Sequence, residues 1–131
     1  MRIGRRSMIA GMAGLASPGL APPARAGARG TAMYGLIGKM TAVQGQRDAL
    51  TAILLEGLGR MPGCLSYVVA HDPVEADTIW VTEVWTDQAA HRGSLQLPEV
   101  QEAIRKGRPL IATFGEGQET VPVGGVGLLQ P

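Results

Sequence analysis

Three stretches of the chain show the apolar patterns that are typical of β-strands. They cover residues 33–41, Cys64–His71 and Thr78–Trp85. The last is the strongest strand signal, because β-branched and aromatic residues occupy most of its positions. Residues 72–77 contain a proline and three acidic residues, a composition typical of an exposed turn. We therefore expect the second and third strands to pair as an antiparallel hairpin.

A helical pattern separates the first two strands. Between residues 47 and 61, apolar side chains recur at three- and four-residue steps and so share one helical face. They are Leu50, Ile53, Leu54, Leu58 and Met61. Pro62 and Gly63 end this helix, since proline lacks a backbone donor and glycine permits positive φ. Such a stripe predicts packing against the core.

Further helical signals follow the third strand. Asp87 is a suitable N-cap for a helix over residues 88–96, because its carboxylate can accept from free backbone amides. Pro98 begins another helical piece that extends to about residue 106. Residues 118–123 alternate around a proline, which indicates an edge strand or an arm.

The elements follow the order β-α-β-β-α-β. This order predicts an α+β, ferredoxin-like fold, with one antiparallel sheet and helices on one of its faces. The other face must carry one of the two alternating side-chain sets of the third strand, and both sets are largely apolar. Exposure of either set to water would be unfavourable. A homodimer packed sheet against sheet is the simplest way to bury it.

Residues 1–30 resemble an export signal and are not expected to belong to the fold. A basic start over residues 1–6 precedes a short apolar run, and Ala24-Arg25-Ala26 fits a small-x-small cleavage site. Arg5 and Arg6 resemble a twin-arginine signal. A Sec-type signal, an uncleaved anchor, cleavage at residues 26–28 and a disordered tail that happens to contain two arginines are the alternatives. We therefore expect a periplasmic or secreted domain over residues 31–124, followed by a tail over residues 125–131.

Charge and cysteine content exclude some classes of function. The chain has a formal net charge of +1, but residues 1–26 hold four of its twelve basic residues and no acid. The remainder therefore has eight basic and eleven acidic residues, which disfavours nucleic-acid binding. The single cysteine, Cys64, excludes an internal disulfide and a cysteine-based metal cluster. Two isolated histidines predict no metal site either.

Five short motifs occur in order along the expected domain. They are Pro62-Gly63-Cys64, Asp72-Pro73, Glu83-Val84-Trp85, Asp87-Gln88-Ala89-Ala90 and Leu97-Pro98. Together they resemble the antibiotic biosynthesis monooxygenase (ABM) family over about residues 33–123. The resemblance implies a dimeric α+β barrel, and some members of the family oxygenate quinols or polyphenols without metal or flavin.

The resemblance implies a small aromatic substrate and molecular oxygen as partners, and no cofactor. The first hypothesis is therefore a cofactor-independent monooxygenase that oxidises quinol-like or polyphenolic small molecules. The alternative is a non-catalytic module on the same scaffold that binds small aromatic ligands or is associated with stress. An isomerase or lyase on this scaffold is a third possibility.

Glu83 and His91 are the candidate catalytic residues. Alternation places Glu83 on the same strand face as Val81 and Trp85, where partial burial would raise its pKa and suit a proton acceptor. A salt bridge or a dimer contact with an arginine such as Arg105 is the alternative role for Glu83. His91 suits proton transfer near neutral pH, and a solvated position on the helix surface is its alternative.

Quinol-oxidising members of the family that the chain resembles often carry two histidines in this region, and the resemblance aligns those positions with Ser94 and Glu99. His91 lies three residues before Ser94, so it could serve the same cavity. The candidate substrate-binding residues are Tyr67, Trp85, His71 and Ser94. Core packing is the alternative for the two aromatic residues. Solvent exposure at a strand end is the alternative for His71.

Overall fold

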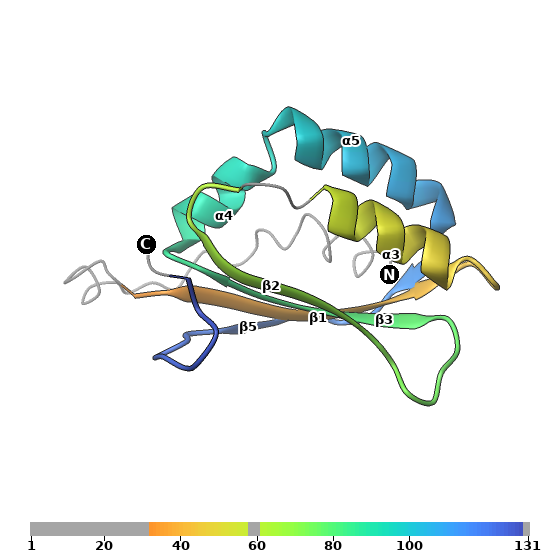
Figure 1. Cartoon of the computed structure of the whole chain (residues 1–131), viewed down its shortest axis with the longest axis horizontal. Coiled ribbons are helices and arrows are strands. Elements are labelled where there is room, and N and C mark those ends of the chain that lie inside the picture. The colour runs from red at the N-terminus through yellow and green to blue at the C-terminus, as the bar shows by residue number, and fades with distance from the viewer. Residues whose placement is uncertain (1–31, 58–60, 130–131) are drawn as a thin grey trace.

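The computed structural model describes residues 32–57 and 61–129 of the chain. Its strands are β1 (Tyr34–Ala42), β2 (Cys64–His71), β3 (Thr78–Trp85), β4 (Ile111–Phe114) and β5 (Gln118–Thr120). Its helices are α3 (Arg47–Glu56), α4 (Gln88–Ser94), α5 (Pro98–Gly107) and the short 3-10 helix η2 (Arg108–Leu110). The helices α3, α4 and α5 lie over one face of the sheet, as Figure 1 shows.

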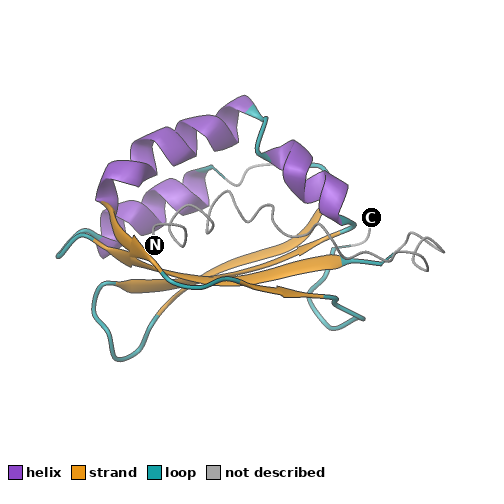
Figure 2. Cartoon of the chain, turned by 180° about the vertical axis from the view of Figure 1, so that it is seen from behind, coloured by secondary structure: helices purple, strands orange, loops and turns teal. Residues whose placement is uncertain are grey.

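The sheet has the strand order β2-β3-β1-β4, and its pairs are antiparallel. Strand β1 pairs with β3 along nearly its whole length. The opposite edge of β1 is shared by two short strands, with β4 against residues 40–42 and β5 against residues 35–37. Figure 2 shows the layer of helices over one face of the sheet from the opposite side. This arrangement confirms the predicted α+β, ferredoxin-like fold.

The core lies between the sheet and the helices. Its buried members are Met40, Ala42, Leu50, Ile79 and Val81. The strand members alternate along β1 and β3, so one side-chain set of each strand packs beneath the helices. Leu50 of α3 is fully buried and joins this layer. The predicted apolar stripe of α3 therefore forms part of the core.

Several predicted boundaries are confirmed and others are wrong. The second and third strands have the predicted bounds. The side chain of Asp87 caps α4 as predicted, because it accepts a hydrogen bond of 2.8 Å from the backbone N–H of Ala90. The helix predicted to extend to residue 61 ends at Glu56, with its cap at Gly57. Residues 58–60 lie outside the described residues.

The last part of the domain differs most from its prediction. The strand that completes the ferredoxin-like sheet is β4, a four-residue segment that the sequence pattern did not predict. The predicted strand over residues 118–123 is confirmed only over Gln118–Thr120, as β5. Pro122 lacks the backbone donor that a longer ladder would need. Both short strands exist because the long edge of β1 offers them backbone partners.

The predicted export signal lies outside the described residues, so its outcome stays open. Among the residues that the structure describes, no helix is long and apolar enough to cross a membrane.

Candidate functional site

A cavity of about 270 Å³ lies between the sheet and the helices. Most of its lining is apolar, with contributions from α3, α5 and the helix-facing side of β1. The lining side chains with polar atoms include Tyr67, Glu83, Trp85, His91, Ser94, Arg108 and Glu119. An apolar cavity with a few convergent polar groups is the typical form of a small-molecule site.

Glu83 projects into this cavity from β3. Only 17% of its side-chain surface is exposed. Burial raises the pKa of Glu83 to about 7, because a carboxylate loses its hydration inside the protein. The indole N–H of Trp85 donates a hydrogen bond of 2.8 Å to the Oε1 atom of Glu83 and partly offsets this rise. Glu83 therefore changes its protonation state near neutral pH. Its small exposed fraction confirms the predicted partial burial.

His91 reaches the same cavity from α4 and is 4% exposed. Its ring packs between the rings of Tyr34 and Trp85, with ring centroids 5.4 Å from each. Burial, and to a smaller extent the charge of Arg92, lower the pKa of His91 to about 4. The imidazole is therefore neutral near pH 7. The predicted alternative of a solvated surface histidine is wrong.

The start of β2 sets the position of α4. Gly63 has φ of 86°, a conformation that side-chain-bearing residues rarely adopt. A Cβ atom at this position would lie 2.6 Å from the Cβ atom of Ala90. The backbone N–H of Thr86 also donates to the carbonyl oxygen of Gly63. Glycine thus lets α4 approach the β2–β3 pair closely enough for His91 to reach Glu83.

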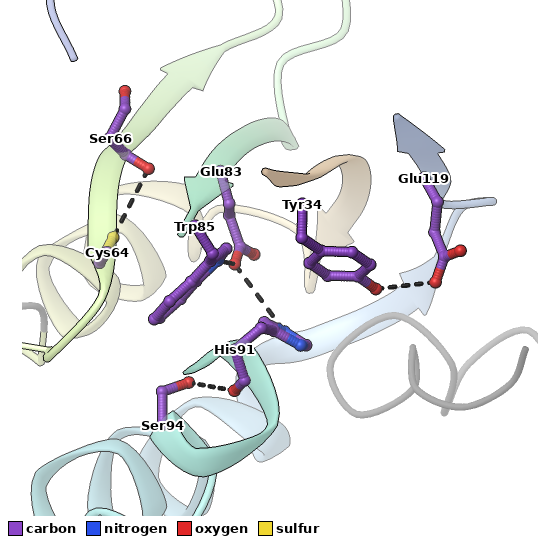
Figure 3. A network of polar contacts seen from close by, with 8 residues as sticks. All are labelled: Tyr34, Cys64, Ser66, Glu83, Trp85, His91, Ser94 and Glu119. Carbon is purple, nitrogen blue, oxygen red and sulfur yellow. Dashed lines mark hydrogen bonds and ion pairs between the residues drawn. The ribbon is translucent and has the colours of Figure 1, made fainter. Parts of the chain in front are cut away.

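The Nε2 atom of His91 lies 3.9 Å from the Oε1 atom of Glu83 (Figure 3). This is longer than a hydrogen bond. The two groups are not an ion pair at neutral pH, because burial disfavours the charged form of each. Together they provide a carboxylate that can take up a proton and a neutral imidazole beside it.

The alternative role of Glu83 in an intrachain salt bridge with Arg105 is wrong. Arg105 lies on the exposed surface of α5 and pairs with Glu102, one turn away on the same helix. The guanidinium therefore has its partner outside the cavity.

The structure brings together five of the six predicted site residues. Tyr67, Trp85 and Ser94 line the cavity beside Glu83 and His91. Burial raises the pKa of Tyr67, so its phenol stays protonated. The hydroxyl of Ser94 is buried and donates a hydrogen bond of 2.7 Å to the backbone carbonyl of His91.

His71 is the predicted site residue that lies elsewhere. It is exposed at the end of β2, with its Nε2 atom 2.9 Å from the Oγ1 atom of Thr51. Glu99 is the second of the two positions, with Ser94, that the resemblance aligns with histidines. It is exposed in the first turn of α5 and does not line the cavity.

Sequence reasoning missed two polar residues at the site, Tyr34 and Glu119. The hydroxyl of Tyr34 donates a hydrogen bond of 2.7 Å to the Oε2 atom of Glu119, a lining residue from β5. Alternation with Met40 and Ala42 could have placed Tyr34 on the helix-facing side of β1. No sequence signal placed β5 beside β1, so Glu119 could not have been found in this way.

The described residues contain no group of three or more histidine, cysteine, aspartate or glutamate side chains arranged to hold a metal ion.

Comparison with known proteins identifies the family. The model of the antibiotic biosynthesis monooxygenase family matches residues 33–106. The chain belongs to this family. A crystal structure from Chloroflexus aurantiacus J-10-fl, which carries the provisional name antibiotic biosynthesis monooxygenase, is 66% identical with a TM-score of 0.72. The match covers 73% of this chain and 98% of that protein.

More distant structures share the fold. A Pseudomonas aeruginosa protein is 21% identical with a TM-score of 0.63, and the match covers 71% of this chain and 96% of that protein. A Caulobacter crescentus CB15 protein with the same provisional name is 17% identical with a TM-score of 0.64. That match covers 72% of this ABM protein and 92% of the relative. No curated protein matches the chain.

The opposite pKa shifts of Glu83 and His91 predict a specific dependence of stability on pH. The folded-state pKa of Glu83 is raised from 4.5 to about 7, so its contribution to stability is lost as pH rises between these values. The pKa of His91 is lowered from 6.5 to about 4, so its contribution is gained as pH rises over nearly the same range. The two contributions therefore oppose each other in the wild-type protein.

Glu83→Gln should remove only the contribution that falls with pH. Between pH 4.5 and 6.5, its free energy of unfolding should rise relative to wild type by on the order of 2 kcal/mol. Urea denaturation at several pH values measures this difference. Glu116→Gln, at an exposed position outside the cavity, is the control and should follow wild type. A constant difference between Glu83→Gln and wild type across this range would contradict the assignment.

Proposed function

We propose that this ABM protein is a cofactor-independent monooxygenase of quinol-like or polyphenolic small molecules. The observation that carries the proposal is the Glu83 carboxyl group, which lies in an apolar cavity with a pKa of about 7 beside a neutral imidazole. A general base works best when its pKa lies near the working pH. The family membership of the chain supports the same class of reaction.

The chemistry needs little from the protein beyond a base and a shaped cavity. Glu83 would take a proton from a phenolic hydroxyl, and the resulting electron-rich anion can transfer one electron to molecular oxygen. Recombination of the two radicals forms a carbon–oxygen bond and a hydroperoxide. Loss of water then leaves one oxygen atom on the ring carbon as a new carbonyl, while the other leaves in the water. For a quinol, the sum is quinol plus O₂ giving hydroxyquinone plus water.

The cavity suits a small aromatic substrate. Its volume of about 270 Å³ is near the lower end of the range for small-molecule sites. The ring of Trp85 is 1% exposed, and the ring of His91 packs edge-on against it. These rings and the aliphatic lining would exclude water and hold a flat substrate close to the base.

One observation favours a non-catalytic ligand-binding module as the second candidate. Ser94 occupies a position where quinol-oxidising relatives often have a histidine, and its hydroxyl is already bonded to the backbone of His91. Such a module would bind small aromatics in the same cavity and release them unchanged.

A homodimer is part of the proposal. The sheet face away from the helices carries Val68 and Ile37, which are 53% and 37% exposed. Their strands flank Thr82 of β3, since Val68 and Ile37 both pair with this residue. Covering this face with a second copy would remove apolar surface from water. The proposal also places the mature domain outside the cytoplasm, on the basis of the predicted signal in residues 1–30.

Oxygen uptake with hydroquinones tests the proposed reaction. Purified metal-free protein should consume oxygen faster than autoxidation alone, with a rate that rises through about pH 7 as Glu83 ionises. Glu83→Gln should lower kcat by about 10²-fold or more, because it removes the base. His71→Ala, outside the cavity, is the control and should keep wild-type turnover. Saturable binding of the hydroquinone without turnover would instead support the non-catalytic module.

The mass of the folded protein in solution tests the dimer. Sedimentation equilibrium should give twice the mass of one chain. Val68→Asp should shift the protein to the monomer, because the new charge would lie in the centre of the buried sheet face. Val74→Asp, in the exposed turn between β2 and β3, is the matched control and should remain dimeric. A wild-type protein that sediments as a monomer at all concentrations would contradict this part of the proposal.

A further inference from the structure

The floor of the cavity is a single row of side chains across four strands. The strand register pairs Tyr67 with Glu83, Glu83 with Leu36, and Leu36 with Glu119. All four residues line the cavity. The two carboxylates therefore stand on opposite sides of one leucine, each one strand away from it.

The spacing between the two carboxylates follows from sheet geometry. Neighbouring strands lie about 4.8 Å apart, so the backbones of Glu83 and Glu119 are about 10 Å apart. For two carboxylates that stand above their own backbones, hydroxyl–carboxylate hydrogen bonds of about 2.7 Å each leave about 5 Å between two hydroxyl oxygens of a ligand. This is close to the separations in both the 1,3 and the 1,4 arrangements on one benzene ring. It is well beyond the separation in the 1,2 arrangement.

Glu119 is held in place by a partner that the proposed reaction does not use. The hydroxyl of Tyr34 donates a 2.7 Å hydrogen bond to its Oε2 atom, and Figure 3 shows this hydroxyl directed toward Glu119 and away from Glu83. Tyr34 is itself 8% exposed, and its ring packs against His91. A carboxylate has two oxygens with about four lone-pair positions, so Glu119 keeps capacity to accept from a ligand.

We propose that Glu119 forms a second subsite, which accepts a second hydroxyl of the ligand while the first faces Glu83. The cavity thereby selects aromatic ligands with two oxygens in the 1,3 or 1,4 arrangement over monophenols and 1,2-diphenols. Leu36 supplies the apolar floor beneath the ring. Tyr34 is a positioning residue, because it acts on the ligand only through Glu119. This inference rests on the proposed function for the identity of the first subsite.

Binding in the absence of oxygen tests the subsite separately from turnover. Anaerobic isothermal titration calorimetry with the purified protein would compare 1,4-hydroquinone, catechol and phenol. Wild type should bind hydroquinone about fivefold more tightly than catechol or phenol, the gain expected from one additional hydrogen bond. Glu119→Ala should remove this preference and leave the affinity for phenol unchanged. Tyr34→Phe should weaken the preference in the same direction, without a change for phenol.

Glu116→Ala is the matched control, because Glu116 precedes β5 and does not line the cavity. It should bind all three ligands as wild type does. Equal affinities of the wild-type protein for the three ligands, no saturable binding of hydroquinone, or an equal loss for phenol and hydroquinone in Glu119→Ala would overturn the proposal. Selective anaerobic binding, with no oxygen uptake once oxygen is admitted, would support the subsite. It would contradict only the proposed monooxygenase reaction.

Discussion

The site depends on one carboxyl group that the fold removes from water. A buried carboxylate without an opposite charge favours its neutral form, and this is the largest influence on the pKa of Glu83. The single hydrogen bond from Trp85 offsets the effect only in part. The same exclusion of water keeps His91 neutral. On the surface these two groups would form a salt bridge, but in this cavity they are a carboxyl group that titrates near neutral pH and a neutral imidazole beside it.

Local features of the chain place these two groups together. The alternation of β3 directs Glu83 toward the helices together with Val81 and Trp85. Asp87 caps the N-terminus of α4 directly after β3. His91 therefore lies about one turn into the helix, close to the end of β3. The positive φ of Gly63 permits the close approach of this helix. In the structure these three features occur together, and the Nε2 atom of His91 lies 3.9 Å from the Oε1 atom of Glu83.

Much of this arrangement could be predicted from the sequence because it depends on local patterns. The apolar alternation of β2 and β3 and the Asp87 cap gave the correct elements and the cavity-facing side of Glu83. Strands β4 and β5 have only four and three residues, too few to show a period, and the edge of β1 determines their pairing. The contact of Tyr34 with Glu119 depends on that pairing and joins residues 85 positions apart. His71 is a site candidate only because histidine suits proton transfer. Its strand position gives no sign that it lies outside the cavity, beside Thr51.

The protonation state of Glu83 is the central claim, and carbon-detected NMR of its side-chain carboxyl measures it most directly. The titration of the ¹³C-labelled protein should show a midpoint at about pH 7 for Glu83. Assignment comes from the signal that is lost in Glu83→Gln. A midpoint near 4.5, the ordinary value for a glutamate, would show that the carboxylate is well hydrated and would contradict the account.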